Sequence, residues 1–280
     1  MIRYTLFLLI GALSFTAVAA HFQPLAGTAF ATHDAKADEE TQEELPFKPS
    51  TDAMADVSKA LADAKADGKL GLVILGANWC HDSRTLISKL KAPEVLAVIE
   101  KNYSTVLVDV GELEHGKDVI QRFGMPVIYG TPTVVIVDPA TGEAVNRHDM
   151  HQWRDAHSIS ESDIKTYFEK MVKAETRGTP ATAPENTELK ALLAEVDAFE
   201  KKQSERIYKG FALIGPMITM NRSDRPENFG DLWNELRDFR YQITDDLKAL
   251  KGDARGRIKA GERGIKLSYP DYQPFSWEKN

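Results

Sequence analysis

A buried strand leads directly toward the only cysteine of the chain. The run Leu70 to Leu75 is continuously apolar, which predicts a central strand covered on both faces. An amphipathic helical pattern starts near Ser83, so Cys80 lies where this strand ends and a helix begins. The free N–H groups and the positive dipole end of a helix stabilise a thiolate, which is the reactive form of cysteine. The junction therefore predicts a nucleophilic thiol.

Helical and extended patterns alternate around this junction. The expected order is helix, strand, helix, strand, helix, strand, strand, helix, with the first two strands parallel and the last two paired as a hairpin. Thr51 or Asp52 should cap the first helix and Ser160 the last, while Pro93 should kink or restart the second. Expected helices lie at 54–64, 83–99, 117–123 and 161–173, and expected strands at 70–75, 105–110, 133–137 and 143–147.

Two motifs and this element order resemble the thioredoxin family. The family's active site reads Trp-Cys-x-x-Cys at a strand-to-helix junction, and this chain has Trp79-Cys80 with Ser83 in place of the second cysteine. Thr131-Pro132 precedes the third expected strand, where thioredoxin-like proteins carry a cis-proline facing the cysteine. The resemblance covers about residues 52–173 and implies an α/β thioredoxin-like fold with a central mixed sheet.

The resemblance also implies roles for individual residues. Cys80 would be the nucleophile, Ser83 would hydrogen-bond its thiolate, and a protonated His81 would favour that thiolate. A serine cannot close a disulfide, so a second, external thiol would have to release a bound partner. The polar residues that follow Cys80 predict an exposed sulfur. Three residues would bind a substrate chain beside the thiol: Trp79, Thr131 and Pro132.

The second half of the chain has a purely helical period. Residues 177–187 have the composition of a linker, and residues 188–252 carry two amphipathic patterns separated by Gly215-Pro216, which should stop the first helix. These patterns predict an antiparallel α-helical hairpin after a thioredoxin-like domain at 51–175. Residues 253–280 form a tail without predicted structure. The pattern leaves open whether the hairpin packs on its own chain, on a partner or on a second copy.

The N-terminus has the features of a secretory signal. Arg3 precedes an apolar run from Leu6 to Val18, and small residues follow up to Ala20. The run is shorter than the roughly 20 residues of a spanning helix, so we expect cleavage and no stable membrane insertion afterwards. Residues 1–20 are thus a predicted signal peptide and 21–50 a flexible tether. The mature chain would be exported, either periplasmic or secreted.

Composition limits the function further. A net charge of −7 gives no electrostatic basis for binding nucleic acid. Because Cys80 is the only cysteine, it must stay free, pair with another molecule or bind a ligand in an oxidising compartment.

Three functions fit these observations. The first is monothiol thiol–disulfide exchange through Cys80, with exported proteins or low-molecular-weight thiols as partners and no cofactor. The second is a non-catalytic thioredoxin-fold binding module. The third is metal binding by Cys80 with His148, His151 and His157, whose spacing matches no recognised zinc pattern. We therefore expect solvated loop histidines and no metal site, and the sequence leaves open whether Cys80 turns over.

Overall fold

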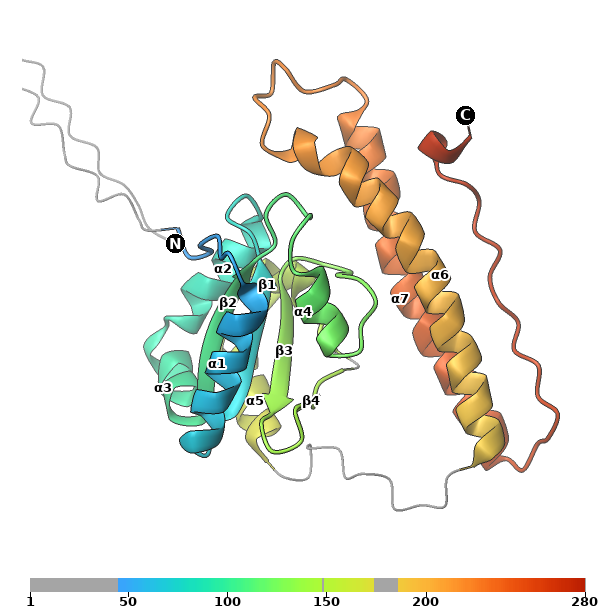
Figure 1. Ribbon diagram of the computed structural model, residues 1–280, viewed down its shortest axis with the longest axis horizontal. Coiled ribbons are helices and arrows are strands. Elements are labelled where there is room, and N and C mark those ends of the chain that lie inside the picture. The colour runs from blue at the N-terminus through green and yellow to red at the C-terminus, as the bar shows by residue number, and fades with distance from the viewer. Residues whose placement is uncertain (1–44, 148, 174–185, 280) are drawn as a thin grey trace, which may run out of the picture. The chain divides into compact units, whose positions relative to one another are not determined.

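A mixed four-stranded sheet lies at the centre of the first half of the chain (Figure 1). The computed structural model describes residues 45–147, 149–173 and 186–279. The strands are β1 (Leu70–Gly76), β2 (Tyr103–Asp109), β3 (Thr133–Asp138) and β4 (Glu143–Ala144), in the order β2-β1-β3-β4. Strand β1 pairs in parallel with β2 and antiparallel with β3. All seven residues of β1 are buried, as its apolar sequence predicts.

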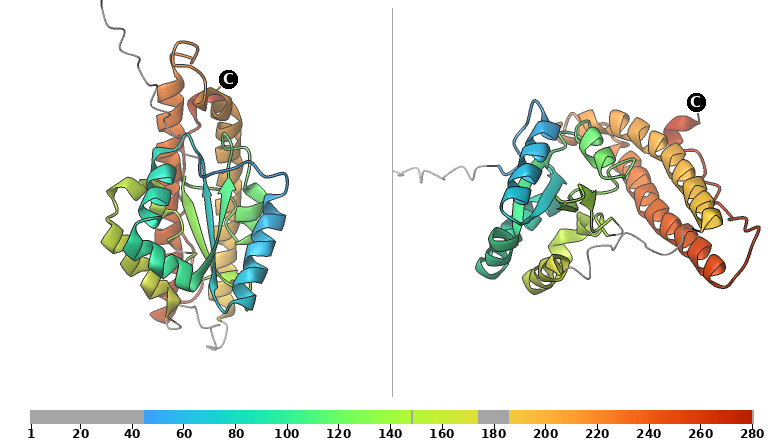
Figure 2. Two further views of the ribbon diagram at one scale, coloured as in Figure 1. Left: turned by 90° about the vertical axis from the view of Figure 1, so that its left-hand side faces the viewer. Right: turned by 60° about the horizontal axis from the view of Figure 1, so that its bottom comes forward.

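Helices cover both faces of the sheet. Successive side chains of β1 point to opposite faces, so they belong to two different apolar clusters. Val73 and Leu75 belong to the apolar cluster formed with α1 (Ala53–Ala66) and α4 (Lys117–Arg122). Leu72 and Ile74 belong to a second cluster. That cluster includes residues of α2 (His81–Leu90), α3 (Pro93–Asn102) and α5 (Glu161–Val172). The left view of Figure 2 shows the strands between these two layers.

Local sequence signals explain most element boundaries. Asp52 caps α1 by accepting a hydrogen bond from the Ala55 N–H at 2.8 Å, and Ser160 caps α5 in the same way. Pro93 restarts the chain as the first residue of α3, a position that needs no N–H donor.

Strand β4 is shorter than the predicted 143–147. Beyond Ala144, the side chain of Asn146, rather than its backbone, makes hydrogen bonds to β3. The Asn146 amide accepts from the Ile136 N–H at 2.8 Å and donates to the Val134 carbonyl at 2.9 Å. The 3-10 helix η1 (Gln152–Ser158) that follows this segment is not apparent from the sequence pattern.

The C-terminal half forms the predicted hairpin of α6 (Thr187–Ile218) and α7 (Phe229–Lys259), which lie side by side in Figures 1 and 2. Two predicted boundaries are wrong. Helix α6 passes Gly215-Pro216 and ends at Ile218, so the proline lies inside the last turn rather than at the helix boundary. Helix α7 runs past 252 to Lys259, because a single glycine weakens a helix but does not end it.

The hairpin packs against the sheet domain, defined here as residues 45–147 and 149–173. One apolar cluster contains residues of both. The Tyr129 hydroxyl donates to Glu200 at 3.0 Å, and the Tyr208 hydroxyl donates to the Pro126 carbonyl at 3.0 Å. The Arg154 guanidinium lies 3.6 Å from the centre of the Tyr241 ring. The hairpin therefore covers part of its apolar surface within its own chain.

Two segments without predicted structure are packed. Phe47, from the predicted tether, is 1% exposed, and its N–H donates to Asn78 Oδ1 at 3.1 Å. Residues 45–50 are thus anchored to the loop before Cys80, because an aromatic side chain in this segment is buried. In the tail, the Phe275 and Trp277 rings stack at 4.3 Å, and Glu278 pairs with Arg206 at 2.7 Å. The predicted signal peptide and residues 21–44 lie outside the described residues.

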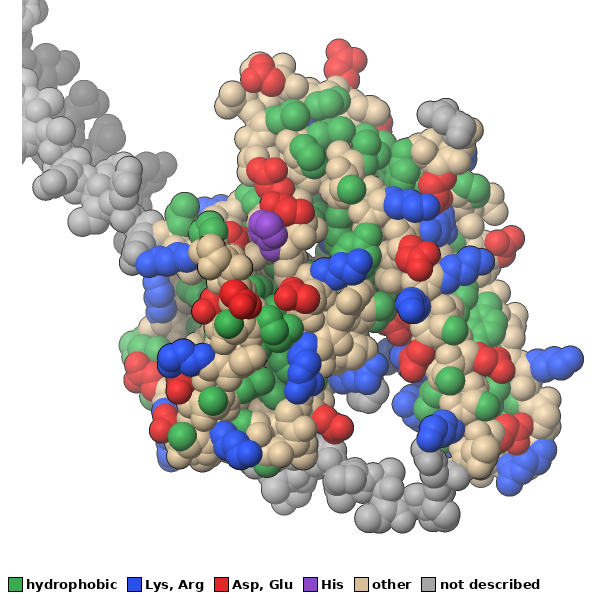
Figure 3. All heavy atoms as spheres, viewed as in Figure 1, with side chains coloured by type: hydrophobic (Ala, Val, Ile, Leu, Met, Phe, Trp, Pro, Cys, Tyr) green, Lys and Arg blue, Asp and Glu red, His purple; other side chains and the backbone are tan. Residues whose placement is uncertain are grey.

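Surface charges are mixed. On the face shown in Figure 3, acidic and basic side chains are interspersed, which agrees with the small net charge of −7. Among the described helices, none combines the length and apolar character needed to cross a bilayer.

Two glycines of the hairpin predict opposite responses to the same substitution. A Cβ on Gly215 would collide with the Glu112 backbone carbonyl, whereas a Cβ on Gly252 would meet nothing within 4 Å. We expect Gly215→Ala to lower the free energy of unfolding by about 1–3 kcal/mol through overpacking. Gly252→Ala should raise it by up to about 1 kcal/mol through helix propensity. Urea unfolding measures both, and equal effects would contradict the observed contact between α6 and the loop at Glu112.

Candidate active site around Cys80

Cys80 is the N-cap residue of α2, at the predicted end of the strand-to-helix loop. Its backbone is extended, with φ −82° and ψ 119°. Its carbonyl accepts the first helical hydrogen bond, from the Arg84 N–H at 3.2 Å. The thiol therefore lies beside the free N–H groups at the start of a helix.

The Thr131–Pro132 peptide lies next to the thiol and is cis, the isomer that the sequence predicts. The Cys80 thiol donates to the Thr131 carbonyl, with a sulfur–oxygen distance of 3.2 Å. Thr131 is half-buried and Pro132 is buried. Two motifs that are far apart in the sequence thus form one site.

Ser83 has a different role from the predicted one. Its side chain is fully buried, and its hydroxyl accepts a hydrogen bond from the Ala77 N–H at 3.3 Å. Among the described residues, its partner is this loop backbone rather than the thiol. Ser83 therefore stabilises the loop that carries Cys80.

His81 is exposed and packs against a second histidine. Its ring lies edge-on to His157 of η1, with ring centres 5.6 Å apart. The neighbouring Asp82 accepts a hydrogen bond from the His157 N–H at 3.0 Å. His81 is thus placed with Asp82 and His157, which sequence reasoning did not group together.

The prediction of an exposed sulfur is wrong, because Cys80 is only 9% exposed. Cys80 belongs to the apolar cluster that includes residues of α6 and α7. Trp79 donates its indole N–H to the Gly111 carbonyl at 2.7 Å and meets Trp233 of α7 edge-on at 6.0 Å. The hairpin therefore covers the surroundings of the thiol, and local sequence could not reveal side chains that come from α7.

Arg240 of α7 is a functional candidate that the sequence reasoning missed. It is 4% exposed, its Nε donates to the Leu236 carbonyl at 3.4 Å, and its guanidinium lies 5.7 Å from the Trp233 ring centre. In the described part of the chain, no carboxylate forms an ion pair with it. An arginine on the buried stripe of a helix, four residues after Leu236, is the signal that could have indicated it.

Electrostatics couple Arg240 to the thiol. Burial lowers the pKa of Arg240 to about 10, while the charges of Tyr241 and Cys80 act to raise that pKa and the charge of Arg154 lowers it. Arg240 therefore remains a cation at neutral pH. Arg240 and the free N–H groups at the start of α2 therefore both place positive charge near the sulfur.

The two loop histidines in the described residues, His151 and His157, do not form a site with Cys80. His148 lies outside the described residues. His151 is half-buried rather than solvated, and its Nδ1 is buried without a hydrogen-bond partner among the described residues. Within those residues, the group of ligand atoms close enough to hold a metal is His81, Asp82 and His157, and it does not include Cys80. The hypothesis of a metal centre on Cys80 and the loop histidines is therefore not supported.

Comparison with known proteins agrees with this geometry. A family model described as thioredoxin-like matches residues 52–139. The chain is a member of the thioredoxin-like superfamily. A solved disulphide isomerase from Xylella fastidiosa Temecula1 is 32% identical, and the match covers 47% of this chain and 99% of that chain with a TM-score of 0.43. The comparison with curated proteins found no match. The family match and the observed sheet order confirm the predicted α/β thioredoxin-like fold.

His151 predicts a pH dependence of stability. Burial, followed by the charge of Arg154, lowers the pKa of His151 from 6.5 to about 4. The unfolded chain therefore binds more protons than the folded chain between these values, and the free energy of unfolding should fall as the pH drops from 6.5 toward 4. His151→Gln should flatten this decline in urea unfolding, whereas the exposed-residue control His115→Gln should keep it. An unchanged slope in His151→Gln would contradict the account.

Arg240 predicts a change in thiol reactivity. Arg240→Met removes the cation but keeps an apolar side chain, so iodoacetamide should alkylate Cys80 several-fold more slowly at pH 7. Arg240→Lys keeps the charge and should retain more of the rate. Mere loosening of the hairpin would expose the sulfur and accelerate alkylation, so a faster reaction in Arg240→Met would contradict the electrostatic role.

Proposed function

We propose that the chain is an exported thiol–disulfide exchange protein that acts through the single thiol of Cys80. The observation that carries the proposal is the 3.2 Å contact between the Cys80 sulfur and the Thr131 carbonyl, which precedes cis-Pro132. A thiol at a helix N-terminus beside a backbone able to pair with a substrate suits attack on a disulfide. Membership of the thioredoxin-like superfamily supports the same class of chemistry.

The proposed exchange has two steps. The Cys80 thiolate attacks one sulfur of a substrate disulfide, a bond forms between the two sulfurs, and the other substrate sulfur leaves as a thiolate. An external low-molecular-weight thiolate then attacks the mixed disulfide and forms a new disulfide with the bound substrate sulfur, and Cys80 leaves as a thiolate. The external thiol is required because Ser83 stands at the resolving position and cannot form a disulfide.

Burial of the thiol favours small reaction partners. Cys80 is 9% exposed, and its neighbour Trp79 is in edge-on contact with Trp233 of α7. A small disulfide needs less displacement of the hairpin than a folded protein does. Exported proteins would then react with the mixed disulfide that forms on Cys80, or they would bind through an extended segment that reaches Thr131.

The same burial favours a second candidate, a thioredoxin-fold binding module without turnover. In that case the thiol would be a buried packing residue, and the hairpin would present the partner surface. The two candidates differ in whether partner binding requires the sulfur of Cys80.

A disulfide-exchange assay distinguishes them. The chain is purified from its native compartment, and its mass reports whether residues 1–20 are removed. It should reduce a small mixed disulfide in the presence of excess external thiol. Cys80→Ser should lower the rate to the uncatalysed background, since no other cysteine exists. The surface variant Ser58→Ala serves as the matched control and should keep the wild-type rate. A wild-type rate at background, or an unchanged rate in Cys80→Ser, would favour the binding module.

A further inference from the structure

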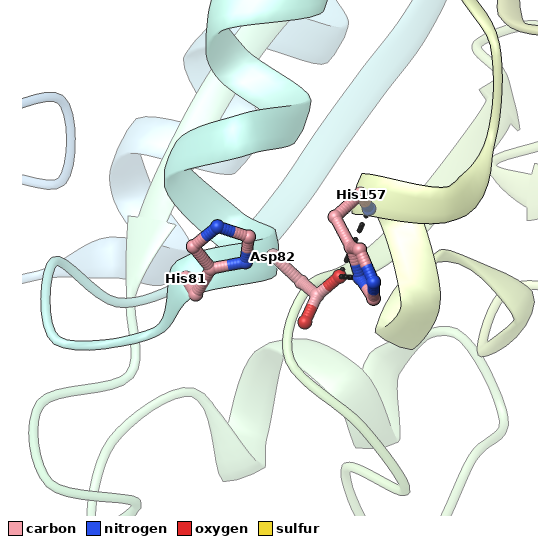
Figure 4. A group of neighbouring side chains, drawn as sticks. All are labelled: His81, Asp82 and His157. Carbon is pink, nitrogen blue, oxygen red and sulfur yellow. Dashed lines mark hydrogen bonds and ion pairs between the residues drawn. The ribbon is translucent and has the colours of Figure 1, made fainter.

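A second cluster of reactive side chains lies beside the thiol loop, and the exchange does not use it. His81 and Asp82 begin α2, and His157 lies near the end of η1. Figure 4 shows Asp82 between the two imidazole rings. One possible ligand atom from each residue lies within 4.8 Å of the others. We infer that these three side chains bind a divalent transition-metal ion of the zinc class.

The donor set and its spacing suit such an ion. Two imidazoles and a carboxylate are ligands that zinc and neighbouring metals accept, with the remaining positions left for water. Ligand atoms around a tetrahedral zinc lie roughly 3.3 Å apart, given metal–ligand distances of about 2.0–2.1 Å. Asp82 Oδ1 and His157 Nδ1 are already 3.0 Å apart. His81 is exposed, and in the described part of the chain its ring has no hydrogen-bond partner to prevent rotation toward them.

The surrounding contacts hold two of the ligands in place. The His157 backbone N–H donates to Asp82 Oδ1 at 3.0 Å, which ties η1 to α2. The Lys89 ammonium donates to three carbonyls of the same turn, those of Ala156, His157 and Ile159, at 3.0, 2.8 and 2.5 Å. The Ser158 hydroxyl lies 3.3 Å from His157 Nε2, where an outer-shell partner would orient a ring that binds metal through Nδ1.

The charges around this cluster favour a bound cation. The positive end of the α2 dipole and the Lys89 ammonium disfavour it. Asp82 and Asp155 supply two carboxylates, and Asp155 Oδ1 lies 3.2 Å from His157 Nδ1. A purely structural link between α2 and η1 would need only Asp82 and His157. His81 is the residue that a metal site requires and a structural link does not.

A zinc titration with His81→Ala tests the inference. The full chain, prepared without a histidine tag, is titrated with Zn²⁺ in competition with a chromophoric chelator, in wild-type and Cys80→Ser backgrounds. We expect one ion per chain in both. His81→Ala should weaken binding by more than the roughly 10–100-fold that loss of an outer-shell partner costs, with the thermal unfolding midpoint unchanged. His115→Ala, another exposed histidine, should bind as the wild type does.

Three outcomes would overturn the inference. They are no stoichiometric zinc binding by the wild type, unchanged binding by His81→Ala, and binding that disappears in Cys80→Ser. The first two would leave Asp82–His157 as a structural link only, and the third would assign the ion to the thiol. None of these readouts depends on disulfide exchange, so failure of one proposal does not imply failure of the other.

Discussion

The antiparallel pairing of β1 with β3 decides where the thiol lies. In this register Leu75 is paired with Thr133, so the loop that leaves β1 and the loop that enters β3 meet at the same end of the sheet. The first loop carries Cys80 and the second carries Thr131 and Pro132, which explains the 3.2 Å contact between them. A shift of one residue would turn each side chain of β3 to the opposite face of the sheet and disrupt its packing against the helices on that face. The buried apolar faces of both strands therefore hold the site together.

The hairpin changes the environment that this pairing creates. The polar residues that follow Cys80 predict a thiol that faces solvent, whereas the folded chain buries it. In the structure, Trp233 meets Trp79 and a buried Arg240 supplies a cation without a carboxylate partner among the described residues. The sulfur thus lies in an apolar cluster with a buried cation nearby. Residues of the C-terminal half thus affect both the solvent exposure of Cys80 and the charge near it. The hairpin is therefore part of the site.

Local patterns predicted most of the elements and the pair of motifs. The apolar run of β1, the caps at Asp52 and Ser160, and Pro93 at the start of α3 are encoded within a few residues, so they could be read directly. Other features could not be read from local sequence. These are the burial of Cys80, the position of Ser83 in the loop and the roles of Phe47 and Arg240. Each depends on contacts between segments far apart in the sequence, and an apolar face does not specify what will cover it. The two misplaced helix ends have another cause, because a glycine or proline lowers helix propensity without fixing the residue at which a helix ends.

Mass spectrometry after incubation with glutathione disulfide tests the central claim most directly. If Cys80 is a nucleophile in the folded chain, the native protein gains one glutathione on that residue, and added thiol removes it. The reaction should proceed under conditions where circular dichroism shows the fold intact. A native chain that stays unmodified and reacts only once it is unfolded would contradict the account, because the thiol would then be a packing residue of the core.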